Sequence, residues 1–251
     1  MFELSLLDLV IVSSILAMAG FIHGVFGIGF PMIATPLLAL ILDVQSAVLI
    51  TLFPTIAVNM VSIYQGGEWR SSIGRFWPLA LFAAIGSMLG ANLLVAFDPS
   101  PFRLLLAAII LLYLALPWMK RLRLDWVANH MYFSMLGFGL IAGMFGGSVN
   151  VMVPILMIFT LELGLARTAM IQTFNLCFLS GKATQVGVFF LAGLIDVGLV
   201  RVAGPGLALA VVALLAGSAI RDRIDSVLYQ DILRKLLLLM ACILVGQYLL
   251  T

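Results

Sequence analysis

Long runs of apolar residues, separated by short polar or charged stretches, make up almost the whole chain. The first half contains runs at 4–26, 30–42, 44–64, 76–96 and 102–119, and the second half contains runs at 127–144, 149–161, 168–190, 203–220 and 233–250. Most of these runs approach the length of about 20 residues that a helix needs to cross a bilayer. Because they are continuous rather than alternating, they predict helices and not the strands of a membrane barrel.

Two of the runs are too short to cross a membrane. The runs 30–42 and 149–161 have 13 residues each, which gives about 20 Å of helix against an apolar core about 30 Å thick. Each directly follows a glycine-rich stretch, "GFIHGVFGIGFP" at 20–31 or "GLIAGMFGGSVN" at 139–150. We therefore expect an all-α membrane protein of eight to ten transmembrane or half-membrane helices.

The two glycine-rich stretches belong to an internal repeat. At an offset of 119, the glycines of the first stretch match those of the second: Gly20 with Gly139, Gly24 with Gly143, and Gly27 with Gly146. Further on the offset becomes 127, which matches Pro78 with Pro205 and Gly90 with Gly217. An ordered series of this kind indicates a duplication. It divides the chain into a first transmembrane repeat (1–119), a basic loop (120–126) and a second transmembrane repeat (127–251).

Composition agrees with a membrane protein, because 64% of the 251 residues are hydrophobic and only 10% are charged. A water-soluble domain of this length has about 25% charged residues. The net charge of +2 is small and does not indicate nucleic-acid binding. The N-terminal run lacks a basic region and a cleavage site, so it is expected to be a retained first span rather than a signal peptide.

The basic residues gather on one side of the predicted bundle. With five segments in each half, the loops of one side contain Arg70, Arg75, Lys120, Arg121, Arg123, Arg167, Arg221 and Arg223. The positive-inside rule makes this side cytoplasmic and places both termini outside. An odd number of segments in each half would turn the second repeat upside down relative to the first. If both short runs are re-entrant, eight spans remain and the parity no longer decides this point.

The matched glycine breaks suggest transport. Inverted repeats with interrupted helices are typical of secondary transporters, which bind substrate near the midplane at unwound backbone. The candidate residues at the breaks are Gly27, Gly29, Gly146, Gly147, Ser148 and Asn150. A helix that begins after Gly29 would present free N–H groups to an anion, and Ser148 and Asn150 are expected to cap the matching helix or to face the ligand. The alternative is helix packing, because glycine also lets membrane helices approach closely.

Polar residues follow one face of two predicted spans. One face carries Thr51, Thr55, Asn59 and Ser62, and the other carries Thr168, Gln172, Asn175, Lys182 and Gln185. Polar faces of this kind turn toward the bundle or a wet cavity. We expect Asn59, Gln172, Asn175, Gln185, Thr51 and Thr55 to contact a substrate, although interhelical hydrogen bonding is sufficient to explain several of them.

Lys182 is the most unusual residue of these faces. It lies three residues past the centre of its run, where a lysine costs about 2.5–3.5 kcal/mol to insert. No acidic residue lies in the middle of any run to neutralise it. An unpaired cation in this place favours an anionic ligand, and the alternative is structural pairing with Glu162 or with backbone carbonyls.

His23 lies in the first glycine-rich stretch and has two equal interpretations. It can couple transport to protons, or it can form a hydrogen bond to a neighbouring carbonyl. The chain has no phosphate-binding loop of the form GxxxxGK[ST] and no HExxH motif. We expect no cofactor and no metal. An intramembrane enzyme and a non-transporting assembly subunit are the alternatives to a transporter.

Two stretches resemble a known family. "AGFIHGVFGIGFPMIATPLLALI" at 19–41 and "AGMFGGSVNVMVPILMI" at 142–158 are similar to the sulfite/sulfonate exporter family TauE/SafE. The resemblance implies two homologous halves and a permease of the bacterial inner membrane for small anions, often sulfur-containing oxyanions or organic acids. The lipid bilayer, a small anion and a coupling ion, H⁺ or Na⁺, are then its expected partners; the sequence does not indicate the oligomeric state.

Overall fold

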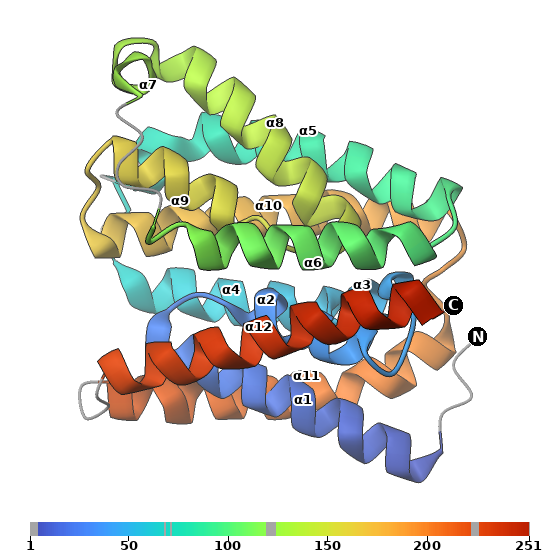
Figure 1. The fold of residues 1–251 in the computed structure, drawn as a ribbon. Helices are drawn as coiled ribbons and strands as arrows, with labels where there is room; N and C mark the ends of the chain where they lie inside the picture. Colours follow the sequence, from blue (N-terminus) through green and yellow to red (C-terminus); the bar gives the residue numbers. More distant parts are fainter. Residues whose placement is uncertain (1–4, 68, 71, 119–123, 222–225, 251) are drawn as a thin grey trace.

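The regular elements of the structure, a computed structural model, are all helices (Figure 1). The structure describes residues 5–67, 69–70, 72–118, 124–221 and 226–250, without the side chains of 226–230 and 232. The first half contains α1 (Leu6–Phe26), α2 (Phe30–Ala39), α3 (Val44–Ile50), α4 (Leu52–Gly66), α5 (Ile73–Ala96) and α6 (Ser100–Ala115). The second half contains α7 (Asp125–Asn129), α8 (Met131–Val149), α9 (Val153–Glu162), α10 (Arg167–Leu191), α11 (Val197–Ile220) and α12 (Ser226–Leu250).

Six helices of the described part are long and apolar enough to cross a membrane, namely α1, α5, α8, α10, α11 and the part of α12 from Leu233 to Leu250. The bent pair α3 and α4, with 45° between the two helices, raises this number to seven. The prediction of an all-helical membrane protein is therefore confirmed. Three shorter apolar helices, α2, α6 and α9, make up the rest of the predicted segments.

Helices α2 and α9 are the short segments that the sequence predicts. Each has 10 residues and is therefore about 15 Å long, half the thickness of the apolar core. Helix α2 follows a break at Gly27 and Gly29, whose φ angles of 80° and 108° favour glycine. Helix α9 follows a break at Asn150, whose φ angle of 64° is the only positive one at a described residue other than glycine.

The second break lies later than predicted, because α8 continues through Gly146, Gly147 and Ser148 to Val149. The glycines of this stretch serve helix packing. A side chain at Gly143 or Gly147 would collide with the α5 backbone, at Ala83 or Ser87 respectively. The alternative interpretation of the glycines is thus correct for this part of α8. The predicted capping of α9 is wrong: the Ser148 hydroxyl donates to the Met144 carbonyl, and α9 begins without a side-chain cap.

Close backbone contact also joins α1 to α11. A side chain at Gly20 or Gly24 would collide with the carbonyl of Ala210 or Leu214, and one at Gly217 would collide with Phe21. The α5–α8 pair repeats this pattern, with Gly90 against Met144. The two pairs lie at opposite edges of the molecule, with α2, α4 and α10 between them (Figure 1). Contacts between small residues of this kind are the usual packing of helices in lipid.

Candidate functional site

Lys182 is buried in the bundle, near the middle of α10. Its side chain is 2% exposed, and its ammonium donates to Gln185 Oε1 at 2.5 Å. Among the described residues it has no second hydrogen-bond partner and no ion pair. Glu162, the carboxylate considered as its structural partner, instead accepts a hydrogen bond from the Leu124 amide at 2.9 Å. Because an ammonium has three donors, two of them remain unused.

Gln185 connects Lys182 to the end of α8. Its Nε2 donates to the carbonyls of Gly146, at 3.1 Å, and Gly147, at 2.8 Å. These carbonyls belong to the last turn of α8, where a helix leaves carbonyl groups without internal partners. Gln185 therefore uses both of its N–H donors on backbone and its oxygen on Lys182. It holds the ammonium beside the second break.

Asn150 joins three segments at this break. It ends α8 in the left-handed conformation, with φ of 64° and ψ of 23°, and its Nδ2 donates to the hydroxyls of Thr35 at 2.7 Å and Thr51 at 2.8 Å. Thr35 belongs to α2, and Thr51 lies between α3 and α4. Both amide hydrogens of Asn150 are therefore used within the protein.

The first break is held by Asn175 from the other half of the chain and by His23 from its own half. Asn175 of α10 donates through Nδ2 to the carbonyl of Gly27 at 3.0 Å. His23 Nδ1 accepts from the amide of Phe30 at 3.3 Å, and its Nε2 lies 2.9 Å from the hydroxyl of Ser62. Since Nδ1 accepts, the proton of a neutral ring is on Nε2. These contacts match the hydrogen-bonding interpretation of His23, with an amide and a hydroxyl in place of the expected carbonyl.

The two polar faces turn inward, as the sequence predicts. Thr51, Thr55 and Asn59 have no exposed surface, and Gln172, Asn175 and Gln185 are at most 1% exposed. Many of their hydrogen bonds serve the fold. The Thr51 and Thr55 hydroxyls donate to carbonyls of the preceding turn, and Gln172 donates to the carbonyls of Ile63 and Gly67 at the end of α4. Thr168 is exposed and does not share this buried face.

The amides differ in what they can still offer a ligand. Gln172, Gln185 and Asn150 each use both N–H donors. Asn59 and Asn175 each make one hydrogen bond through Nδ2, so each keeps one N–H. The side-chain oxygens of Asn59, Asn150, Gln172 and Asn175 are buried without a partner. An anion needs donors, which Lys182, Asn59 and Asn175 retain.

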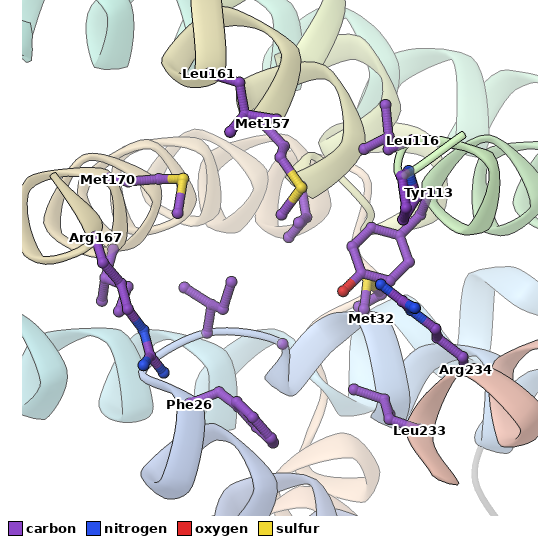
Figure 2. Close-up of a pocket in the computed structure, with 15 residues that line it drawn as sticks. Phe26, Met32, Tyr113, Leu116, Met157, Leu161, Arg167, Met170, Leu233 and Arg234 are labelled. Carbon is purple, nitrogen blue, oxygen red and sulfur yellow. The ribbon is translucent and has the colours of Figure 1, made fainter. Parts of the chain in front are cut away.

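A separate cavity of about 290 Å³ lies among α2, α6, α9, α10 and α12 (Figure 2). Its lining consists of Phe26, Ile28, Gly29, Met32, Tyr113, Leu116, Pro117, Val153, Met157, Leu161, Arg167, Met170, Ile171, Leu233 and Arg234. Gly29 is the only one of the predicted site residues in this lining. The sequence predicts Arg167 in a basic loop, and no sequence pattern points to Tyr113 or Arg234. Among the described residues no group of three potential metal ligands occurs.

Comparison with known protein families gives a match that covers nearly the whole chain. A family model described as "Sulfite exporter TauE/SafE" matches residues 12–248. No curated protein and no solved structure matches the chain. Both breaks, both polar faces and the cavity lie within the matched range.

Proposed function

We propose that this chain, which belongs to the sulfite exporter TauE/SafE family, is a secondary transporter of small organic or sulfur-containing anions such as sulfite, sulfonates or carboxylates. The family is one of membrane transporters, and the six or seven candidate spans agree with a multi-pass membrane protein. For its location we propose the inner membrane, with the basic loops in the cytoplasm.

The buried ammonium of Lys182 is the observation that carries the proposed anion site. A lone cation in the bundle costs insertion free energy, and its only partner in the described part of the chain is the neutral Gln185. An anion that reaches Lys182 would compensate this charge and receive hydrogen bonds from the two unused ammonium donors. The remaining N–H groups of Asn59 and Asn175 are the next candidates.

The other predicted residues have supporting roles in this proposal. Gln185 orients Lys182, while Asn150 and Gln172 fix the second break and the end of α4. The unpartnered oxygens of Asn150 and Gln172 suit water or a cation rather than an anion. We keep Gly27 and Gly29 as the backbone of the first break, and Gly146 and Gly147 as the helix end that leads to the second. Coupling to H⁺ or Na⁺ stays a prediction, and the contacts of His23 with Phe30 and Ser62 favour its hydrogen-bonding interpretation over a part in coupling.

We infer that the two halves are inverted repeats, with the site between them. The supporting observation is a match between two sets of glycine contacts. Gly20 and Gly24 of α1 pack on α11 in the same way as Gly143 and Gly147 of α8 pack on α5. This sets an offset of 123 for α1 and α8, one helical turn from the offset of 119 that the sequence suggests, and it also pairs Pro31 with Pro154. For α5 and α11 the offset stays 127. Gly90 of α5 contacts Met144 of α8, and Gly217 of α11 makes the corresponding contact with Phe21 of α1. In Figure 1, α1 and α8 run in opposite directions.

The test is anion transport by the purified protein in liposomes. Uptake of sulfite, methanesulfonate, butanesulfonate and acetate is measured for the wild type, Lys182→Met and Lys235→Met. Lys235 is an exposed lysine paired with Asp231, so it controls for the loss of a charge. Because a hydrogen bond to a charged group contributes about 1.5–3 kcal/mol, we expect Lys182→Met to weaken the apparent affinity by about ten- to hundredfold, and Lys235→Met to leave it unchanged.

Two results would contradict parts of this proposal. A wild-type protein that moves none of these anions would contradict the transport function. Correctly inserted Lys182→Met protein with wild-type affinity would leave transport intact and make the lysine structural.

A further inference from the structure

The cavity beside the two breaks combines an apolar wall with a few cationic groups. Met32, Met157 and Met170 point into it from three different helices (Figure 2). Methionine side chains are flexible and polarizable, so they adapt to apolar groups of different shape. The polar side chains of the lining are Arg167, Arg234 and Tyr113. In the part of the chain that the structure describes, no carboxylate belongs to the lining.

The two arginines are free to bind a ligand. Both are exposed, and neither has a hydrogen bond or ion pair with any residue that the structure describes. Arg167 and Arg234 lie on opposite sides of the cavity, and the Tyr113 hydroxyl points toward the guanidinium of Arg234 (Figure 2). A guanidinium presents a planar fork of donors that matches carboxylate and other oxyanion groups. Among the described residues, the lining therefore has two positive charges and no counter-charge.

The cavity reaches the beginning of both short helices. It extends from Leu116, Pro117 and Leu161, near the ends of α6 and α9, to Gly29 and Val153. Gly29 precedes α2 and supplies no side-chain cap to it. The positive end of the α2 dipole adds to the field of the two arginines. Lys182 does not belong to the lining.

We propose that this cavity is a second anion site, separate from Lys182, which binds an anion with an apolar body. The oxyanion head lies between Arg167 and Arg234, and the apolar body lies against the methionines. A volume of about 290 Å³ is at the lower end for small-molecule sites. That the bound anion is also the transported one rests on the function proposed above. An organic sulfonate or carboxylate uses both parts of the cavity, whereas sulfite has no apolar body and uses only the arginines.

The test is a binding titration with a series of sulfonates that share one head group. Wild-type protein in nanodiscs of zwitterionic lipid is titrated by calorimetry with sulfite, methanesulfonate, propanesulfonate and pentanesulfonate. Burial of a methylene is worth about 0.8 kcal/mol, so the affinity is expected to rise about fourfold for each methylene that enters the cavity. Sulfite is expected to bind no better than methanesulfonate. Equal affinities along the series would overturn the proposal.

Charge variants decide where this binding occurs. Arg167→Gln and Arg234→Gln are each expected to weaken pentanesulfonate binding by about tenfold, whereas Lys235→Gln, one residue further along α12, leaves it unchanged. Unchanged binding in both arginine variants would overturn the proposal. In Lys182→Met the affinity is expected to rise with sulfonate chain length as in the wild type. If this rise is lost in Lys182→Met, the binding occurs at Lys182 instead. Since the measurement is binding, its result does not depend on whether the protein transports the anion.

An anionic lipid shares the chemistry of the proposed ligand, and a second lipid composition separates the two. The titration is repeated in nanodiscs that contain phosphatidylglycerol. An unchanged chain-length series supports a soluble organic anion. Loss of the series in these nanodiscs would assign the cavity to lipid and overturn the proposal.

Discussion

The ammonium of Lys182 and the side-chain oxygen of Gln185 lie 2.5 Å apart, and the same glutamine donates to two carbonyls at the end of α8. A single neutral side chain thus forms hydrogen bonds with both a buried cation and a helix end. We expect Gln185→Leu to lower the free energy of unfolding by about 2–4 kcal/mol, because each buried polar group left without a partner costs about 1–3 kcal/mol. Thermal unfolding in detergent measures the effect.

Gln45 is a matched control for this substitution. It is half-buried and makes one hydrogen bond, from Nε2 to the Leu94 carbonyl at 3.1 Å. Gln45→Leu should therefore cost about 1 kcal/mol. Equal losses in the two variants would mean that Gln185 is no more important to the fold than a glutamine nearer the surface.

Glycine positions of α8 should differ sharply in their tolerance of alanine. A side-chain carbon at Gly147 would meet the backbone of Ser87, while one at Gly137 on the same helix has no atom within 4 Å. Overpacking costs about 1–3 kcal/mol, and alanine is favoured over glycine by about 1 kcal/mol in a helix. Gly147→Ala should lower the melting temperature, and Gly137→Ala should leave it unchanged or raise it. The opposite order would contradict the packing of α8 on α5.

Asn150 combines a left-handed backbone with two hydrogen bonds, and two substitutions separate these properties. Asn150→Gly keeps the conformation and loses the hydrogen bonds to Thr35 and Thr51, at a cost of about 1–3 kcal/mol. Asn150→Ala loses the same hydrogen bonds and adds about 1–2 kcal/mol for the positive φ. We expect the glycine variant to have the higher melting temperature. If alanine is tolerated as well as glycine, the backbone at 150 does not have the φ angle of 64° described above.

His23 can be tested as a site of proton coupling. In His23→Asn, the asparagine oxygen can still accept a hydrogen bond from the Phe30 amide, but the side chain has no titratable group. His130, which is exposed, provides the matched control His130→Asn. Because the ring of His23 already serves Phe30 and Ser62, we expect the pH profile of transport in liposomes to be the same in the wild type and both variants. Loss of the pH dependence in His23→Asn alone would instead assign the coupling to His23.

Most of the helices could be predicted because the bilayer imposes a simple rule on their length, but the division of the run 44–64 into α3 and α4 could not. A segment of 10 to 13 residues cannot cross the apolar core, so the exceptional status of α2 and α9 is visible in the sequence. The position of the second break is not. Glycine in "GMFGGS" suggests an unwound backbone, but it equally permits close packing, and only the position of Ala83 and Ser87 on α5 decides between the two.

The candidate site could be predicted by residue type but not by hydrogen bonding. The spacing of Gln172, Asn175, Lys182 and Gln185 places them on one buried face, and the structure agrees. Which amide hydrogens remain available depends on carbonyls of α4, α8 and the first break, which are distant in sequence. Arg234 lies one residue inside an apolar run, and no local pattern brings it near Arg167.

The backbone contact of α1 with α11, and of α5 with α8, joins one helix from each half of the chain. At these glycines the backbones of the two helices touch directly, so we expect each pair to move as one unit. If the protein transports as proposed, a motion that opens the centre first to one side and then to the other would separate the α1–α11 pair from the α5–α8 pair. We then expect its hinges in α2–α4 and α9–α10, the segments that follow the two breaks, and not in the loop between the predicted repeats. The boundary between the two predicted repeats and the boundary along which we expect the molecule to open would then be different surfaces.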